Sequence, residues 1–251
     1  SAASDVYKRQ VINLFCGPAV NAARGIAFQV NNAVNGFVVN FMMALNPQIT
    51  KQYAAGNREY MMTLIFQGAR LSFYMLLLLS LPILVNTHYV LGLWLKIVPE
   101  HAVSFVQLVL VFAMSESISQ PLVTAMLATG KIRNYQLVVG GLQMMNLPVS
   151  YVLLRMGAVP ETVLIVAIAI SQCCLAARLL MLRGMIGLSV RLYLKKVYTN
   201  VLMVSFISMA VPILFVSHMD ETFLDFVVSC AVTVVCTGFT IYYVAVSYTH
   251  L

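Results

Sequence analysis

Charged residues are scarce in this sequence. Asp, Glu, Lys and Arg make up 9% of the 251 residues, where soluble domains carry about 25%. Hydrophobic residues make up 61%, and the mean hydropathy is +0.90. This balance excludes an ordinary soluble domain and predicts an all-α, polytopic integral membrane protein.

Acidic residues are the scarcer of the two charge classes. There are 8 Asp and Glu against 15 Lys and Arg, which gives a net charge of +7. In a soluble protein this excess would suggest nucleic acid binding, but here the basic residues lie between apolar runs. Membrane lipids are therefore the expected partner, and nucleic acid is not.

Motifs of catalysis and metal binding are also lacking. The four His and five Cys have no metal-ligand spacing, and there is no glycine-rich phosphate loop and no nucleophile with a base and an orienting acid. The cysteines are odd in number and lie in apolar segments, which favours small core residues over disulfides. We expect no metal site, no cofactor and no catalytic residue, so an enzyme is not predicted.

What the sequence has in abundance is long apolar runs. One crossing of a bilayer needs about 20 apolar residues, and seven runs meet this length. Four of them contain a proline, at 82, 121, 148 and 212, which permits a kink. The predicted spans are Gly25–Leu45, Leu64–Val85, Ala102–Leu127, Gln136–Leu154, Thr162–Met181, Asn200–Val216 and Phe223–Val246.

Basic residues predict the orientation of these spans. The loops after the first, third and fifth spans are rich in Lys and Arg, which marks them as cytoplasmic. The opposite side has three basic residues, Arg24, Lys96 and Arg155, together with four acidic ones. The first span therefore runs from outside to inside. The cytoplasmic cations are Lys51, Arg58, Lys131, Arg133, Arg183, Arg191, Lys195 and Lys196.

The segment 183–199 alternates apolar and basic residues. This pattern favours an amphipathic helix on the inner leaflet, where Arg191, Lys195 and Lys196 reach anionic head groups, over a plain connecting loop. The segment divides the chain into five spans before it and two after it.

The first span contains a stripe of amides. Gln29, Asn32, Gly36 and Asn40 fall within a band roughly 80° wide on a helix, and Asn35 lies beside it. Unpaired amides are costly in hydrocarbon. The stripe is either a helix-packing seam, in which amides bond to neighbouring helices across a glycine, or the wall of a water-filled cavity.

A carboxylate lies near the middle of the third span. Insertion scales place the cost of a central charge at roughly 2.5–3.5 kcal/mol, so Glu116 is protonated, paired with a cation, or in contact with water. Arg70, inside the second span, is the candidate partner, unless it extends to the inner surface. Arg24, Arg155 and Arg178 lie near helix ends, which favours interfacial anchors.

Both ends of the chain look foreign to the rest. Residues 1–10 (SAASDVYKRQ) and 246–251 (VSYTHL) resemble translated sequencing-adapter read-through and are left out of the fold prediction.

Three stretches carry a resemblance to a known family. They are LFCGPAVNAARGIAFQVNNAVNGFVVNFMMALNPQITKQYAAG, LPILVNTHYVLGLWLKIVPEHA and TAMLATGKIRNYQ. They resemble bacterial polysaccharide-export flippases, the oligosaccharidyl-lipid branch of the multidrug and polysaccharide exporter superfamily. The NPQITK and ATGKI blocks are the most specific, and the last two spans match only in hydrophobicity.

The resemblance implies the C-terminal lobe of a MATE-like two-lobe fold in the bacterial cytoplasmic membrane. Residues 11–182 would be the end of helix 7 and helices 8–12, residues 183–199 a basic amphipathic cytoplasmic linker, and residues 200–245 two additional transmembrane helices. The span parity this requires agrees with the orientation predicted from the loop charges.

The resemblance also implies a function. The family moves undecaprenyl-diphosphate-linked oligosaccharides across the membrane by alternating access, for O-antigen, capsule or exopolysaccharide synthesis. Polysaccharide polymerases and glycosyltransferases would be partners. By this resemblance Arg24 and Arg70 would meet the diphosphate, Asn32, Asn35, Asn40 and Gln120 the sugars, and Glu116 a coupling ion or Arg70.

Two other functions remain open at this point. A cation-coupled multidrug exporter of the same fold suits Glu116 and the uncharged amides about as well. A non-transporting scaffold of a polysaccharide synthesis complex is disfavoured, because a scaffold does not need polar residues inside the membrane.

Overall fold

The computed structural model describes residues 2–216 and 222–247. Every secondary-structure element in these ranges is helical, which confirms the all-α prediction. The elements are α1 (Ala2–Ala54), α2 (Arg58–Val85), α3 (Thr87–Leu95), α4 (Ala102–Ala128), α5 (Ile132–Met144), α6 (Asn146–Arg155), α7 (Thr162–Ile186), α8 (Val190–Tyr193), the π-helix η1 (Leu194–Tyr198), α9 (Thr199–Val216) and α10 (Phe223–Ser247).

Five helical segments among the described residues are long and apolar enough to cross a membrane, which indicates a multi-pass membrane protein. The other two predicted spans are helical but are not among these five. One lies within α1, whose amides lower its hydropathy, and the other coincides with α9, which ends where the described residues break off. The five segments are Arg58–Val85, Ala102–Ala128, Ile132–Arg155, Thr162–Ile186 and Phe223–Tyr243.

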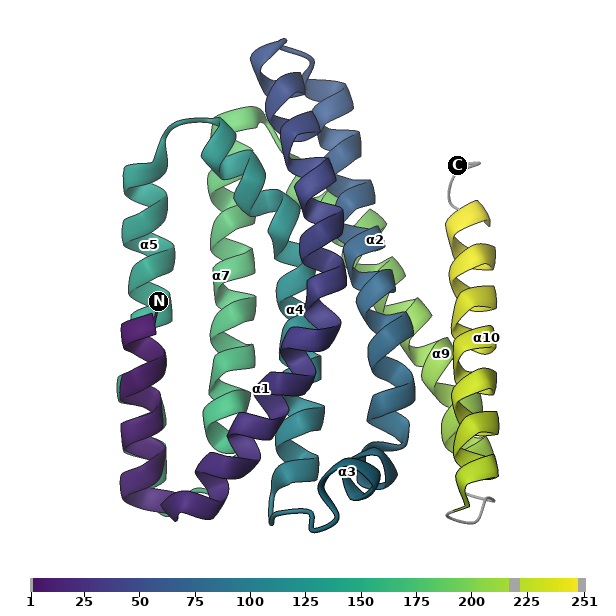
Figure 1. Cartoon of the computed structure of the whole chain (residues 1–251). Coiled ribbons are helices and arrows are strands. Elements are labelled where there is room, and N and C mark those ends of the chain that lie inside the picture. Colours follow the sequence, from purple (N-terminus) through teal and green to yellow (C-terminus); the bar gives the residue numbers. More distant parts are fainter. Residues whose placement is uncertain (1, 217–221, 248–251) are drawn as a thin grey trace.

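Helix α4 lies at the centre of the bundle. It packs against α1, α2 and α7, while α10 packs against α9 and α2 at one edge (Figure 1). The core between these helices consists of large aliphatic and aromatic side chains. Those with no more than 1% exposure include Ile65, Leu76, Leu77, Phe105, Leu110 and Leu122.

The fourth predicted span lies within one candidate crossing, Ile132–Arg155, which is interrupted at Met145. Helix α5 ends at Met144 and α6 begins at Asn146. Pro148 explains the break, because it has no N–H to donate to the carbonyl of Met144 four residues earlier. Helices α2, α4 and α9 continue through Pro82, Pro121 and Pro212.

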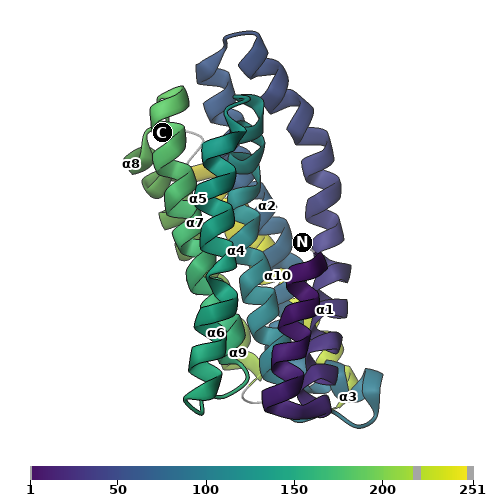
Figure 2. The same cartoon turned by 90° about the vertical axis from the view of Figure 1, so that its left-hand side faces the viewer.

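Helix α1 bends sharply. Figures 1 and 2 show its first part running in the opposite direction to the rest, although hydrogen bonds assign residues 2–54 to one helix. The suspected foreign tails are residues 2–10 at the start of α1 and 246–247 at the end of α10, while 248–251 lie outside the described residues.

The basic loops lie together in space. The α1–α2, α4–α5 and α7–α8 connections are at the top of Figure 1, and the α3–α4 and α6–α7 connections are at the bottom. The cations predicted to be cytoplasmic on these three connections therefore occupy one end of the bundle, which we call the cationic end. At the other end, His101 and Glu161 bond across two loops at 2.5 Å.

Candidate functional site

The amide stripe of α1 lies on the exposed face of the helix. Asn32 and Asn40 are exposed, and Asn35 is half-buried. Val34, Val38 and Met42 on the opposite face are buried in the core. Asn32 and Asn40 are therefore not part of a packing seam between described helices.

Gln120 extends this amide surface onto α4. It is exposed and lies one helical turn before Thr124, whose hydroxyl donates to Oδ1 of Asn46 on α1 at 2.7 Å. That bond fixes the register of α4 against α1. It places Gln120 level with the part of α1 that carries Asn40.

Arg70 lies on a different side of the molecule. Its neighbours one turn away on α2 face the linker and α9, because Phe66 contacts the Tyr193 ring at 5.6 Å and Tyr74 donates to Asn200 at 2.5 Å. Arg70 is half-buried on this face. Among the described residues no ion pair joins it to Glu116, so the structure brings Arg70 neither to that carboxylate nor to the amide stripe.

Arg24 is buried rather than interfacial. Its side chain is 5% exposed, and its guanidinium lies 5.1 Å from the centre of the Phe28 ring. A cation over an aromatic face is stabilised by the ring quadrupole. Arg24 lies on the same face of α1 as the buried Val34, Val38 and Met42 and so does not share a surface with Asn32 and Asn40. Arg155 is exposed at the end of α6, as expected of an anchor.

Glu116 is the start of a chain of polar side chains. Ser171 on α7 donates to its carboxylate, and the Ser171 hydroxyl lies 3.4 Å from that of Ser115. The amide of Gln172 donates to Ser115 and accepts from the Tyr198 hydroxyl at 2.8 Å. These five residues, which we call the Glu116 chain, connect the middle of α4 through α7 to the π-helix η1. A π-helical turn is rare and is frequent at functional sites.

The Glu116 chain answers one of the questions left open by the sequence. Glu116 has no ion-pair partner among the described residues. Glu116 is half-buried, so part of its surface remains accessible for a proton or a cation.

Arg178 is the residue that sequence reasoning missed. It is 3% exposed, and its Nε and Nη1 atoms are buried with no hydrogen-bond partner in the part of the chain that the structure describes. It was expected at the inner end of a span closing at Met181, but α7 continues to Ile186. Arg178 is therefore about two turns inside the helix rather than at its end.

Arg178 faces the same seam as the Glu116 chain. It follows Ser171 by seven residues, which is two helical turns on one face, and helical side chains lean towards the N-terminus. Ser119, one turn after Glu116 on the facing side of α4, also has a buried hydroxyl without a partner among the described residues. The i, i+7 spacing of Ser171 and Arg178 is the sequence signal that could have identified this seam.

The remaining polar residues have local roles. Asn146 is buried and accepts a bond from Ser150 at 3.0 Å within α6, and Gln143 is exposed. In the two described ranges, no group of three His, Cys, Asp or Glu side chains is placed to hold a metal ion.

Comparisons with known proteins give no relative for this chain. No protein-family model, no curated protein and no solved structure matches it.

Proposed function

We propose that the chain is part of a flippase. This flippase would move undecaprenyl-diphosphate-linked oligosaccharides across the bacterial cytoplasmic membrane by alternating access. The glycan would serve O-antigen, capsule or exopolysaccharide synthesis, alongside a polymerase and glycosyltransferases. The chain would supply the C-terminal lobe of a MATE-like fold. The observation that carries this proposal is the exposed amide face of α1.

The amide face needs hydrogen-bonding partners. Hydrocarbon provides none, and each unsatisfied polar group in it costs several kcal/mol. Asn32 and Asn40 have no covering helix in the described chain, so water, a ligand or another protein surface must satisfy them. An amide offers both a donor and an acceptor, which suits the hydroxyls of a sugar. Asn32, Asn35, Asn40 and Gln120 are accordingly the proposed glycan contacts.

The arginines contribute less to this proposal than the resemblance implied. Neither Arg24 nor Arg70 lies on the amide face. We therefore propose no described residue as the contact for the diphosphate.

Replacing the amides by leucine tests the proposal. In the full-length protein, the double substitution Asn32→Leu and Asn40→Leu removes two amides, each contributing roughly 0.5–1.5 kcal/mol, and we expect about tenfold slower glycan export. The measurement is the rate at which surface polysaccharide appears in cells that depend on the protein. The matched control is Gln136→Leu, an exposed amide on α5.

Normal export by the double variant, with protein levels equal to wild type, would refute the role of the amide face. An equal loss in the Gln136→Leu control would show a general effect of leucine on the protein instead.

A second function is favoured by the Glu116 chain. A carboxylate bonded to a serine inside a membrane helix suits a cation-coupled multidrug exporter, in which proton or sodium binding at Glu116 drives transport. Glu116→Gln keeps the shape of the side chain but removes its charge. If the protein is such an exporter, we expect drug resistance in a sensitised host to fall with Glu116→Gln and to persist with Asn32→Leu. Unchanged resistance in the Glu116→Gln variant would count against coupling.

A further inference from the structure

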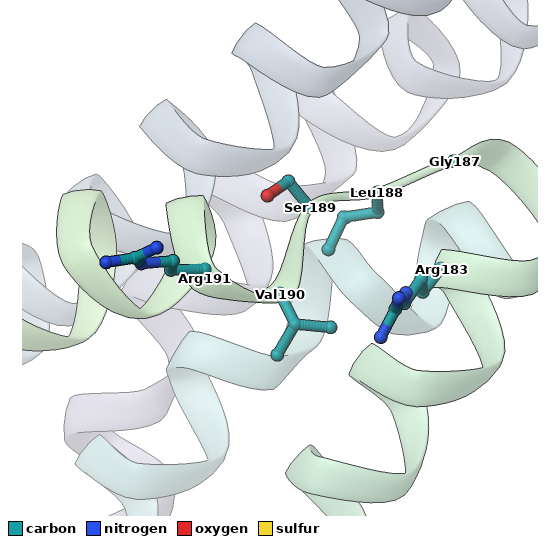
Figure 3. Close-up of a pocket in the computed structure, with 6 residues that line it drawn as sticks. All are labelled: Arg183, Gly187, Leu188, Ser189, Val190 and Arg191. Carbon is teal, nitrogen blue, oxygen red and sulfur yellow. The ribbon is translucent and has the colours of Figure 1, made fainter.

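The turn between α7 and α8 forms a pocket at the cationic end. Its volume is about 480 Å³. Figure 3 shows Arg183 and Arg191 on either side of the turn, with Leu188 and Val190 between them. The lining residues are Arg183, Gly187, Leu188, Ser189, Val190 and Arg191.

The backbone of this turn is well defined by local contacts. Gly187 has a left-handed φ of 74°, and its N–H donates to the carbonyl of Arg183 at 3.2 Å, which closes α7. The side chain of Leu188 is fully buried. Ser189 then caps α8 by accepting from the N–H of Leu192 at 3.4 Å. These contacts hold the last turn of α7 and the first turn of α8 at a fixed separation.

The linker after the pocket is anchored in the bundle. Tyr193 and Val197 are fully buried, and the Tyr193 hydroxyl donates to the carbonyl of Ile118 on α4 at 2.9 Å. Burial raises the pKa of Tyr193, so its hydroxyl stays protonated and remains a donor. The exposed side chains of the linker include the basic Arg191, Lys195 and Lys196 and the apolar Leu192 and Leu194. The bundle therefore covers Tyr193 and Val197, while Leu192 and Leu194 stay exposed beside the basic residues.

Among the described residues, no acidic side chain neutralises the positive charge of the pocket. Residues 162–219 contain no Asp or Glu. Neither Arg183 nor Arg191 forms an ion pair with a described carboxylate, and both side chains are exposed. Guanidinium groups bind phosphate oxygens through several parallel hydrogen bonds.

We propose that this pocket binds a phosphate group, with Arg183 and Arg191 as its ligands. The phosphate can belong to an anionic phospholipid of the cytoplasmic leaflet or to free phosphate. Val190 is half-buried between the arginines, and its apolar side chain suits a lipid, whose glycerol and acyl carbons follow its phosphate. The proposal does not depend on what the protein transports.

Native mass spectrometry of the full chain tests the proposal. The protein is loaded in detergent with phosphatidylglycerol or with a glycosyl diacylglycerol that lacks phosphate, and inorganic phosphate is added as a competitor. Each of Arg183→Gln and Arg191→Gln is expected to lower phosphatidylglycerol binding about fivefold. The matched control is Lys131→Gln, an exposed cation in another loop of the same end, which should change binding less than twofold.

The arms of the experiment separate the two phosphate sources. Retention of phosphatidylglycerol that resists inorganic phosphate supports the pocket as a lipid site. Displacement of the lipid by inorganic phosphate supports it as a site for free phosphate. Equal binding of the lipid without phosphate, wild-type binding by the Arg183→Gln/Arg191→Gln double variant, or an equal loss with Lys131→Gln would each overturn the proposal.

Discussion

At the scale of single residues, the seam between α4 and α7 carries polar groups that cost stability. A buried donor or acceptor without a partner costs about 1–3 kcal/mol, and more when the group is charged. Arg178 and Ser119 are both in this state among the described residues. Glu116, on the same seam, is bonded to Ser171 instead. Such a cost is typical of residues that are kept for function rather than for folding.

Replacing Arg178 by methionine is therefore expected to stabilise the protein. Methionine fills similar space without charge, and we expect the free energy of unfolding to rise by roughly 1–3 kcal/mol. The measurement is unfolding of the purified chain in mixed detergent micelles by increasing sodium dodecyl sulfate. Arg133→Met, at an exposed position on α5, is the control and should stay within about 0.5 kcal/mol of wild type.

A loss of stability with Arg178→Met would show that the guanidinium has a favourable partner. A gain in stability combined with lost transport would assign Arg178 to the working site.

The sequence did not predict how far Arg178 lies from the end of its helix. The amide stripe and Glu116 were identified because their chemistry is unusual in an apolar run. Arg178 was assigned to a helix end because the predicted span stopped at Met181, whereas α7 extends to Ile186. Helix ends depend on the following turn, here at Gly187, and hydrophobicity alone does not locate that turn.

At the scale of elements, α1, α2 and α4 meet at a close junction. A Cβ atom added to Gly68 on α2 would lie 2.3 Å from Cδ2 of Leu45 and 3.3 Å from Cγ of Pro121. The proline is inside α4, and Tyr193 from the linker donates to the carbonyl of Ile118 three residues before it. The junction thus joins three helices and the linker at the one proline of α4.

Alanine at Gly68 is expected to disturb this junction. Overpacking costs roughly 1–3 kcal/mol, and the Pro121 ring cannot rotate away. The same unfolding titration measures the change. The control is Gly141→Ala in α5, where an added Cβ meets nothing within 4 Å. There alanine should leave stability unchanged or raise it by roughly 0.5–1 kcal/mol, because it loses less entropy than glycine.

If Gly68→Ala is as stable as wild type, the Leu45 side chain moves aside and the junction tolerates a methyl group. The account of a close three-helix contact would then be wrong.

The sequence predicted the positions of the helices better than the breaks and bends within them. The seven predicted spans are helical in the structure, the fourth of them as α5 and α6, because long apolar runs have few alternatives in a bilayer. The break between α5 and α6 and the bend of α1 were not predicted as such. Pro148 was identified as a possible kink, but proline also lies inside α2, α4 and α9, which continue. Neighbouring contacts decide between a kink and a break, and they are not visible in one sequence.

At the scale of the whole molecule, two polar surfaces matter for the proposed function: the cationic end and the amide face of α1. The cationic end gathers loops that are far apart in the sequence (Figure 1). The amide face of α1, with Gln120 beside it, is the one polar surface that we place against water within the membrane. Exposed apolar side chains on α5, α7 and α10, such as Leu137, Leu180 and Val235, suit contact with lipid.

The central claim is that the amide face borders water and not lipid, and cysteine labelling tests it most directly. Asn32→Cys and Asn40→Cys are compared with Ala169→Cys on α7 and Val235→Cys on α10, which are also exposed. Each is made in a cysteine-free, full-length protein and treated in open membrane fragments with a charged thiol reagent. Only a thiolate in contact with water reacts readily. The account predicts fast labelling at positions 32 and 40 and slow labelling at 169 and 235, whereas equally slow labelling at all four positions would contradict it.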